Sequence, residues 1–412
     1  MDFEMLGLSP RLVTILAEQG ITKPTPIQTQ AMPHAMNGRD VMGLAQTGTG
    51  KTAAFGLPLI HILMSQGTKP APKSVRGLIL APTRELAKQI TDNLHAYTKG
   101  THLKVGLVVG GVSINAQIKR LERGLDLLVA TPGRLIDLLD RRSVTLGDTN
   151  FLVLDEADQM LDLGFIHALR RIAPLLSSDR QTMLFSATMP KQMAELSSAY
   201  LTDPVRVEVS RSGKVADKVS QSVHFVAQSD KFALLTSLLD LHRDELALVF
   251  SRTKHGAEKM KKNLVARGFA ADSIHGNKSQ NQRDRAIKAF REGSNRVLVA
   301  TDVAARGIDI PGVRYVYNYD LPNVSENYVH RIGRTARADA EGTAIAFCSP
   351  EEMSDLRGIE KLMKTDITVA GGVPWSREEI PPKKGRGKSG GQKRPGQGAR
   401  RPRRGNRSRK AA

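Results

Sequence analysis

A short glycine-rich segment constrains the fold of this chain more than any other feature. Residues 45–52 read Ala-Gln-Thr-Gly-Thr-Gly-Lys-Thr, between a predicted strand that ends at Leu44 and a predicted helix over Thr52–Met64. Strand, loop and helix in this order form the context of a phosphate-binding loop, because glycines let backbone N–H groups turn toward an anion. An ordinary glycine-rich turn is the alternative. The segment favours an open α/β sheet that binds a nucleotide phosphate.

Short apolar segments alternate with longer amphipathic ones from about residue 40 to residue 200. This alternation predicts βαβ units and a parallel sheet that helices cover on both faces. The predicted strands are Asp40–Leu44, Gly77–Ala81, Val105–Val109, Leu125–Ala130, Phe151–Leu154 and Thr182–Phe185. Helical patterns include Arg84–Tyr97 and Lys191–Tyr200.

A second alternating series follows the polar segment Arg211–Lys218. Its predicted strands are Gln221–Val226, Leu246–Phe250, Arg296–Ala300 and Arg314–Tyr317, and its predicted helices are Lys231–Leu241, Lys254–Arg267 and Gln280–Arg291. We therefore expect two tandem α/β domains, residues 1–208 and 219–365, joined by a linker over 209–218. Periodicity fades after Lys364, so residues 366–412 are predicted to be a tail.

The charge of the chain is concentrated in this tail. The formal net charge is +20, which is compatible with nucleic acid, an anionic membrane or solubility alone. Residues 381–412 hold 13 Lys or Arg and no Asp or Glu, which leaves +7 for residues 1–380. With almost no apolar side chains, residues 381–412 are expected to be disordered. The tail is predicted to add affinity for nucleic acid; the alternative is that it only keeps the protein soluble.

Cysteine usage and apolar runs exclude several classes of protein. The chain has one cysteine, Cys348, inside the apolar run Thr343–Cys348. An intramolecular disulfide and a cysteine-based zinc site are therefore impossible, and we expect a buried thiol rather than a reactive one. The N-terminal residues do not resemble a signal peptide, and no apolar run approaches the roughly 18 residues of a membrane span. We expect a cytoplasmic protein with no membrane partner.

An acidic cluster directly follows the predicted strand Phe151–Leu154. It reads Asp-Glu-Ala-Asp over residues 155–158. Ligands of open parallel sheets lie at the carboxyl ends of the strands, where a carboxylate can bind Mg²⁺ held by phosphates. The alternative is that the cluster only caps the following helix. The expected roles are Mg²⁺ binding by Asp155 and Thr52, contact of Lys51 with the β- and γ-phosphates, and water activation by Glu156.

The order and spacing of the motifs resemble those of the DEAD-box RNA helicases, over roughly residues 1–365. Further segments that match the family are residues 23–28 (Lys-Pro-Thr-Pro-Ile-Gln), 82–87 (Pro-Thr-Arg-Glu-Leu-Ala), 110–111 (Gly-Gly), 131–134 (Thr-Pro-Gly-Arg), 186–188 (Ser-Ala-Thr), 250–253 (Phe-Ser-Arg-Thr), 275–276 (His-Gly), 300–309 and 330–337. The chain is most similar to the bacterial subgroup with a short N-terminus and a basic tail.

The resemblance implies two RecA-like domains and an ATP-dependent RNA helicase. Such an enzyme unwinds short RNA duplexes locally or remodels RNA–protein complexes, with RNA-stimulated hydrolysis of ATP to ADP and phosphate and with ATP and Mg²⁺ as cofactors. The expected partner is RNA, single-stranded or in short duplexes, bound without sequence preference. Ribosomal and RNA-decay assemblies are candidate partners, and a monomer is expected.

The resemblance divides the nucleotide site between both domains. Gln28 is expected to read the adenine with Lys23 nearby, and Phe3 to stack on the base; the alternative is that Phe3 packs with Leu6 and Leu8. The other predicted nucleotide-binding residues are Ala45, Gln46, Thr47, Gly48, Thr49, Gly50, Lys51, Thr52 and, for the ribose, Asp309. Two arginine fingers from the second domain, Arg334 and Arg337, would stabilise charge on the transferred phosphoryl group.

The resemblance also implies an RNA-binding side on each domain, which holds the sugar–phosphate backbone. The predicted RNA-binding residues are Pro82, Thr83, Arg84, Gly111, Thr131, Pro132, Gly133 and Arg134 in the first domain, and Arg252, His275, Gly276, Gln280, Arg283, Thr301 and Arg306 in the second. The residues expected to couple the ATP and RNA sites are Asp158, Ser186, Thr188 and His330.

Two positions have alanine where a glycine is usual: Ala45 departs from the general phosphate-loop pattern, and Ala336 departs from the family pattern. A methyl group at position 336 is harmless in a helix but unfavourable if the backbone needs a positive φ. A passive RNA-binding or annealing protein that acts through its basic tail is the alternative function. A DNA translocase is a third, which the 155–158 cluster and the Gln28 motif disfavour.

Overall fold

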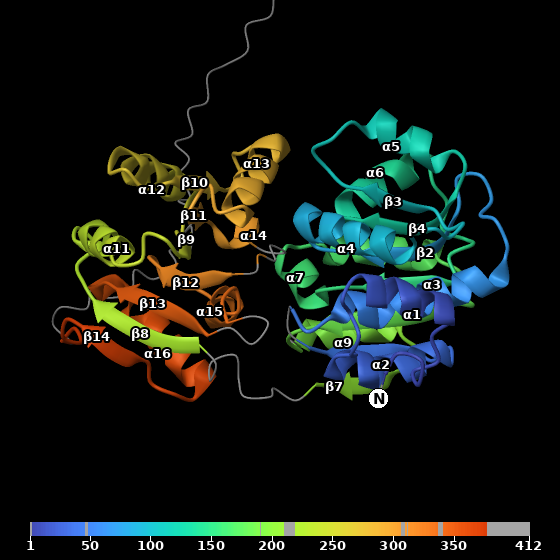
Figure 1. The fold of residues 1–412 in the computed structure, drawn as a ribbon, viewed down its shortest axis with the longest axis horizontal. Helices are drawn as coiled ribbons and strands as arrows, with labels where there is room; N and C mark the ends of the chain where they lie inside the picture. Colours follow the sequence, from blue (N-terminus) through green and yellow to red (C-terminus); the bar gives the residue numbers. More distant parts are fainter. Residues whose placement is uncertain are drawn as a thin grey trace, which may run out of the picture.

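Each half of the chain builds a seven-stranded parallel sheet covered by helices on both faces (Figure 1). The computed structural model describes residues 2–45, 48–189, 191–209, 219–305, 310, 312–336 and 341–376. The strand order is β3-β4-β2-β5-β6-β1-β7 in the first sheet and β10-β11-β9-β12-β13-β8-β14 in the second. The predicted fold class, two tandem RecA-like α/β domains, is confirmed.

The first domain contains the first seven strands. Its elements are α1 (Pro10–Glu18), α2 (Pro26–Met36), β1 (Val41–Leu44), α3 (Lys51–Gln66), β2 (Val75–Leu80), α4 (Arg84–Tyr97), β3 (Val105–Val108), α5 (Ile114–Leu121), β4 (Leu125–Ala130), α6 (Pro132–Asp140), β5 (Phe151–Leu154), α7 (Ala157–Asp162), α8 (Ile166–Ile172), η1 (Ala173–Leu175), β6 (Gln181–Ser186), α9 (Lys191–Tyr200) and β7 (Val205–Glu208).

The second domain repeats the architecture. Its elements are β8 (Val219–Phe225), α11 (Lys231–Asp240), β9 (Leu246–Phe250), α12 (Lys254–Ala266), β10 (Ala271–Ile274), α13 (Gln280–Arg291), β11 (Val297–Ala300), α14 (Asp302–Ala305), β12 (Val313–Asn318), α15 (Ser325–Ile332), β13 (Gly342–Cys348), η2 (Pro350–Glu352), α16 (Met353–Met363) and β14 (Thr368–Gly371).

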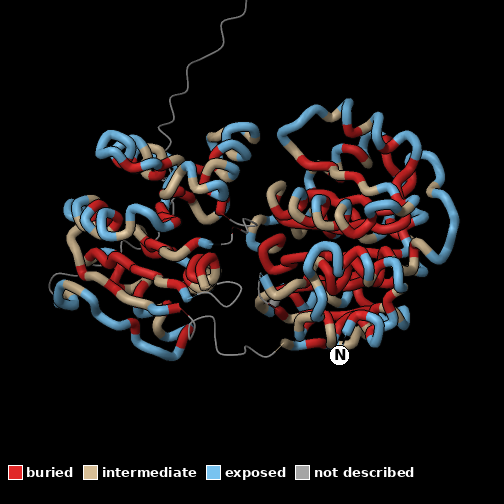
Figure 2. The backbone as a smooth tube through the Cα atoms, viewed as in Figure 1, coloured by how far each residue is buried: buried red, intermediate tan, exposed pale blue. Residues whose placement is uncertain are grey.

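The central strands are apolar throughout because both faces of each sheet are covered. In β5 all four residues are buried, and alternate side chains enter two separate cores: Phe151 and Val153 one, Leu152 and Leu154 the other. A period of two is what strand geometry requires. Figure 2 shows the result, with buried strands inside and exposure concentrated on the outer surfaces of the helices.

All the predicted strands are present, and four more complete the sheets. The strand β13 covers the apolar run in which Cys348 was predicted to be buried; its thiol is fully buried and burial raises its pKa to about 12. The short strands β7 and β10 have mixed compositions, VRVE and ADSI, without the continuous apolar run that marks a buried parallel strand.

The strand β14 corrects the predicted start of the tail. It pairs in parallel with β8, and farther along the Trp375 indole N–H donates to the Cys348 carbonyl at 2.9 Å. Residues 366–376 therefore lie against the second sheet, although they were predicted to be tail. The predicted disorder of 381–412 and nearly all of the predicted linker fall outside the described residues. No helix in the described part of the chain is long and apolar enough to cross a membrane.

Candidate functional site

The phosphate-loop lysine and the first acidic-cluster carboxylate lie together at the carboxyl edge of the first sheet. Strands β1 and β5 flank β6, so the segments that follow them meet at this edge. The Lys51 Nζ lies 3.8 Å from the Asp155 Oδ1 and donates to the Ala45 carbonyl at 3.2 Å. Both side chains are buried. A buried cation and carboxylate stabilise each other here because neither is well hydrated.

The glycines of the loop adopt conformations that L side chains rarely take. Gly48 has φ +85° and Gly50 has φ +90°. A Cβ atom at position 50 would come within 2.5 Å of the Gln28 amide nitrogen. Thr49 and Thr52 are half-buried and Gly48 is exposed, so this part of the loop borders solvent. The predicted contacts of Gln46 and Thr47 fall outside the described residues.

The pKa of the Asp155 carboxyl is compatible with a magnesium site. Burial raises the pKa of this carboxyl to about 6, Lys51 opposes that rise, and Glu156 and Asp158 add to it. A bound cation would therefore stabilise the ionised form. A carboxylate and a hydroxyl are hard oxygen ligands of the kind that Mg²⁺ prefers, so Asp155 and Thr52 fit the ion. The backbone of the loop and Lys51 would hold the phosphates.

Glu156 adopts a strained backbone conformation, with φ +51° and ψ +50°. Such left-handed geometry costs a residue with a side chain roughly 1–2 kcal/mol. Glu156 stands at the position that caps α7, yet its side chain makes no capping hydrogen bond to that helix. The alternative of simple capping therefore does not explain this residue. Strain of this kind is typical of functional sites.

Asp158 connects the acidic cluster to the segment that follows β6. Its Oδ2 accepts hydrogen bonds from the Ala187 N–H (3.2 Å), the Thr188 N–H (2.9 Å) and the Thr188 hydroxyl (2.8 Å). The Ser186 hydroxyl donates to the Thr188 carbonyl at 2.7 Å. Three of the predicted coupling residues thus form one hydrogen-bonded unit beside Asp155.

The predicted adenine motif contacts the phosphate loop directly. The Gln28 Oε1 accepts from the Thr25 N–H at 2.9 Å, and its Nε2 donates to the Gly50 carbonyl at 3.0 Å. Both ends of this amide are therefore engaged, and adenine recognition would require some of these bonds to be exchanged. Lys23 is exposed beside it.

Phe3 packs as the alternative prediction describes. Its ring is 2% exposed, in the same apolar core as Leu6 and Leu8. Stacking on an adenine would require this ring to move out of the core. The base contact of Phe3 stays a prediction.

The predicted RNA-binding loops of the first domain gather at one edge of the sheet, since β3, β4 and β2 are neighbours. The Arg84 guanidinium lies over Gly111, where a Cβ atom would collide with it. Arg134 donates to the Val112 carbonyl at 3.2 Å. Two arginines thus flank the same glycine loop. The remaining predicted residues lie at or just before the N-terminal ends of α4 and α6: Pro82, Thr83, Thr131, Pro132 and Gly133.

A carboxylate that the sequence analysis did not assign joins the RNA-binding sides of the two domains. The Glu85 Oε1 lies 3.0 Å from an Arg283 nitrogen and accepts from the Gln280 amide at 3.0 Å. Arg84 donates to the Gln280 Oε1 at 3.3 Å. These contacts link α4 to α13, which face each other in Figure 1. Glu85 lies inside the 82–87 motif, which is the signal that would have identified it.

The other predicted RNA-binding residues of the second domain have protein partners. Arg252 bonds to the Glu352 carboxylate at 2.7 Å and keeps 40% of its side chain exposed. His275 lies 3.1 Å from the Glu258 carboxylate, whose pKa is lowered to about 2 by hydrogen bonds from Ser273, His275 and Lys278. Gly276 is exposed and Thr301 half-buried. Arg306 falls outside the described residues.

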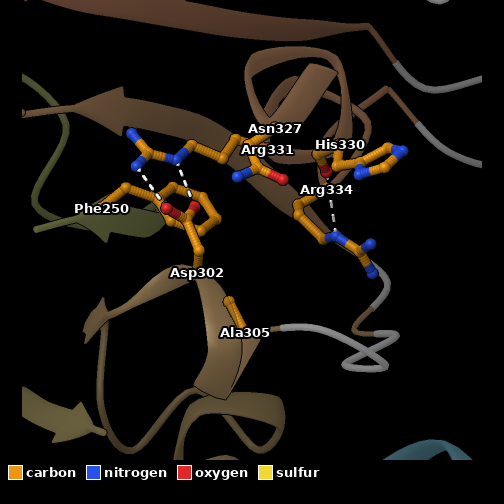
Figure 3. Close-up of a pocket in the computed structure, with 7 residues that line it drawn as sticks. All are labelled: Phe250, Asp302, Ala305, Asn327, His330, Arg331 and Arg334. Atoms are coloured by element: carbon orange, nitrogen blue, oxygen red, sulfur yellow. Dashed lines mark hydrogen bonds and ion pairs between the residues drawn. The ribbon is translucent and has the colours of Figure 1, made fainter. Parts of the chain in front are cut away.

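A shallow cavity between α14 and α15 contains two of the predicted arginine-motif residues, His330 and Arg334 (Figure 3). The Arg334 Nε donates to the His330 carbonyl at 3.1 Å. Figure 3 shows the side chains of these two residues on the same side of the cavity, away from the ion pair of the buried Arg331 with the half-buried Asp302. Arg337 and Asp309 lie outside the described residues.

The same cavity is lined by Arg331, a residue that the sequence analysis left unassigned. This residue is 2% exposed and bonds to both Asp302 carboxylate oxygens, at 2.5 and 2.8 Å. Its guanidinium also stacks over the Phe250 ring, 4.9 Å from the centroid. The pair fixes α14 against α15 and so orients the segment that carries Arg334.

Ala336, which stands where the family usually has glycine, lies at a position where the backbone needs a positive φ. Ala336 has φ +54°, the unfavourable case of the two that the sequence left open. A Cβ atom on Gly342 would come within 2.6 Å of the Ala336 nitrogen, so the two segments approach closely. The other replacement, Ala45, is 5% exposed and provides the carbonyl that Lys51 contacts.

Comparison with known proteins agrees with this geometry. The family model for the DEAD/DEAH box helicase matches residues 25–196, and that for the helicase conserved C-terminal domain matches residues 230–339. The DEAD-box ATP-dependent RNA helicase CshA of Bacillus cereus is 43% identical over 362 residues, which is 88% of this chain and 68% of the relative. The CshA protein of Bacillus subtilis is 43% identical over 364 residues, 88% of this chain and 73% of the relative.

Two solved structures share the arrangement of both domains. The structure of S. cerevisiae Dbp5 bound to RNA and ADP BeF3 is 32% identical, with a TM-score of 0.79, and the match covers 90% of this chain and 95% of that one. Mss116p bound to ssRNA and AMP-PNP is 28% identical, with a TM-score of 0.80 over 92% of this chain and 79% of that one. The chain therefore belongs to the DEAD-box ATP-dependent RNA helicase family.

Proposed function

We propose that this protein hydrolyses ATP in an RNA-stimulated reaction and uses it to open short RNA duplexes or to remodel RNA–protein complexes. The observation that carries the proposal is the division of the site. Lys51, Asp155 and Glu156 belong to the first domain, whereas Arg334 belongs to the second. Turnover then depends on an arrangement of the two domains that RNA favours.

The residues of the first domain bind and orient the reactants. Lys51 and the N–H groups of the phosphate loop hold the phosphates, while Asp155 and Thr52 bind Mg²⁺, which neutralises phosphate charge when bound. The Glu156 carboxylate orients the attacking water and accepts its proton. Arg334, with Arg337, stabilises the negative charge that develops on the transferred group.

The hydrogen-bonded unit around Asp158 transmits the state of the phosphate site. Because Asp158 follows Asp155 and Glu156 in sequence and binds Ala187 and Thr188, a shift of the cluster moves the segment after β6. His330 contributes to the same coupling from the second domain. The two RNA-binding sides, joined at Glu85, together hold one strand in a path that a duplex cannot follow.

The test is the rate of ATP hydrolysis with and without RNA. RNA should raise the rate, whereas Lys51→Ala and Glu156→Gln should abolish turnover in its presence. Lys51→Ala removes a phosphate contact, so it should also weaken nucleotide binding, while Glu156→Gln should retain it. Equal rates with and without RNA would contradict the proposed coupling.

The alternative is a passive RNA-binding or annealing protein, in which the basic tail binds the RNA. It is favoured by the 13 cations of residues 381–412. If the tail only adds affinity for the RNA backbone, its deletion should reduce the slope of log K against log salt by about 0.7 for each phosphate contact that is lost. Turnover at saturating RNA should remain unchanged. Strand separation by the Lys51→Ala variant at the level of the unmodified protein would favour the alternative.

A further inference from the structure

The second domain has a groove of about 550 Å³, and Arg252 is the one lining residue to which the function described above assigns a role. It lies between α11 and α12, which are neighbours in Figure 1, and the ends of β9 and β12 form its floor. Its volume is within the ~300–1,000 Å³ range of ligand sites.

Two cations line this groove: Arg252, which bonds to the Glu352 carboxylate, and Lys259. Helix α12 carries Lys254, Lys259, Lys261 and Lys262, and its one acidic residue, Glu258, bonds to His275 and Lys278. Lys259 lines the groove, is exposed, and makes no ion pair with a carboxylate among the described residues. The rim is therefore attractive to an anion.

The acidic residue inside the groove does not cancel this charge. The Asp320 carboxylate accepts from the Arg252 N–H at 2.8 Å and the Ser251 hydroxyl at 3.3 Å, and lies 3.9 Å from the Lys231 ammonium. It is 13% exposed. The Asp320 carboxylate thus bonds to groups of the protein itself and presents little negative charge to a ligand.

The walls combine aromatic rings with amides. Phe232 and Tyr319 are both half-buried, and the amides of Gln228 and Asn263 are exposed. Rings that stack with bases, beside cations that bind phosphates, are the usual components of a site for single-stranded nucleic acid. A purely apolar peptide would leave Lys259 and the amides without partners.

The groove is continuous with the predicted RNA-binding side of the domain. Arg252 and Thr253 follow β9 and line the groove, and Thr253 caps α12 by accepting the Gly256 N–H at 3.0 Å. An RNA strand held by Arg252 can therefore continue directly into the groove between α11 and α12.

We propose that this groove binds the part of an RNA strand that extends beyond the segment held by the two domains. Lys259 contacts a backbone phosphate, and Phe232 and Tyr319 receive a base. The inference rests on the proposed function, since it requires RNA on the adjoining surface. It gives the protein a preference for a substrate with a single-stranded extension over a short strand alone.

The experiment measures the affinity of single-stranded oligonucleotides that grow one nucleotide at a time. We expect an increase in affinity when the extension reaches the groove, and Lys259→Gln should reduce this increase by the contribution of one phosphate contact. One phosphate contact contributes a slope of about 0.7 in log salt, or about fivefold in affinity at 0.1 M salt relative to 1 M. Oligonucleotides too short to reach the groove should bind both proteins equally.

Lys261→Gln is the matched control. It removes the same charge from the same helix, but Lys261 lies about 200° around the helix from Lys259 and does not line the groove. Equal losses for short and extended RNA, no loss with Lys259→Gln, or the same loss with Lys261→Gln would each overturn the proposal. RNA-stimulated hydrolysis with the short oligonucleotide tests the proposed function separately.

A photoreactive base in the extension provides a second measurement. It should crosslink to the peptide that contains Phe232 or the one that contains Tyr319. Crosslinks confined to the first domain and to the segment after β9 would overturn the assignment of RNA to the groove and would favour a protein partner there.

Discussion

At the residue scale, two non-glycine residues carry left-handed backbones at the places where the ATP site is assembled. Glu156 has φ +51° and Ala336 has φ +54°. Each conformation costs free energy that the surrounding structure must offset. At Glu156 the strain accompanies a predicted catalytic carboxylate. At Ala336 it follows from a methyl group where the family usually has none.

Replacing Ala336 by glycine should stabilise the second domain. Relief of the left-handed strain exceeds the entropy that glycine adds to the unfolded chain, so the free energy of unfolding should rise by about 0.5–1 kcal/mol. Thermal or urea unfolding of the two proteins measures the change. Ala266→Gly, at the exposed last residue of α12, is the control and should be slightly destabilising. A loss of stability in Ala336→Gly would contradict this account.

The raised pKa of Asp155 predicts a pH dependence of nucleotide binding. Its folded-state pKa, about 6, lies above the ordinary value, so the carboxyl becomes protonated as the pH falls through 6. Only the ionised form binds Mg²⁺, and the affinity for Mg²⁺–nucleotide should therefore decrease across that range. Titration with a fluorescent nucleotide at several pH values measures it.

The control for this pH dependence is Asp155→Asn. The phosphates of the nucleotide also titrate, and the variant retains their contribution while lacking that of the carboxyl. Identical pH profiles for the variant and the unmodified protein would exclude Asp155 as the titrating group.

At the scale of the elements, sheet order decides which loops meet. The order β5-β6-β1 brings the acidic cluster, the 186–188 segment and the phosphate loop together, and the order β3-β4-β2 brings Arg84 and Arg134 to one glycine loop. Apart from the edge strand β3, these loops follow strands whose residues are almost all buried. Their positions are consequently fixed by the two cores rather than by local sequence.

Replacing Thr188 by valine should uncouple hydrolysis from strand separation. The change removes the 2.8 Å bond from the hydroxyl to Asp158 and leaves the backbone bond in place. Loss of about 1 kcal/mol from this contact should reduce duplex opening about fivefold, with a smaller effect on RNA-stimulated hydrolysis.

The matched control is Thr182→Val in β6, the strand that precedes Thr188. The Thr182 hydroxyl is buried and has no hydrogen-bond partner in the described structure, so valine should be tolerated there. Parallel losses of hydrolysis and strand separation in Thr188→Val would argue against a coupling role.

At the scale of the whole molecule, the two domains are in contact through residues predicted to bind RNA. Glu85 is the centre of these contacts and is 8% exposed, with Arg283 14% exposed. A partly buried, charge-assisted contact of this kind resists salt better than a surface ion pair. It favours the arrangement in which both RNA-binding sides face the same strand.

Glu85→Gln should shift the protein toward separated domains. It removes the negative charge that Arg283 contacts. A loss of about 1 kcal/mol from this contact changes the ratio of joined to separated domains about fivefold. Fluorescence energy transfer between one label on each domain measures this in the absence of RNA and nucleotide. Asp92→Asn, an exposed residue of the same helix paired with Lys88, is the control. An unchanged distribution in Glu85→Gln would show that these contacts do not hold the domains together.

The sequence determined the elements and the chemistry that each loop offers. The ranges of β4, β5, α4, α9 and α13 were predicted to the residue, because periodicity and caps are local. Of the four strands that were not predicted, β7, β10 and β14 lie at sheet edges and carry no apolar run, so only pairing with a neighbour defines them. The fourth, β13, lies inside the second sheet and contains the apolar run Thr343–Cys348, which was not assigned to a strand.

Tertiary structure alone decided which groups touch. Motif order suggested that Lys51 and Asp155 share a site, but their 3.8 Å separation depends on the strand order of a folded sheet. The contact of Glu85 with Gln280 and Arg283 spans two domains, and the backbone conformation of Ala336 depends on the segment packed against it. A chain position specifies what a side chain can do. The partners of that side chain are specified by the packing of segments far apart in the sequence.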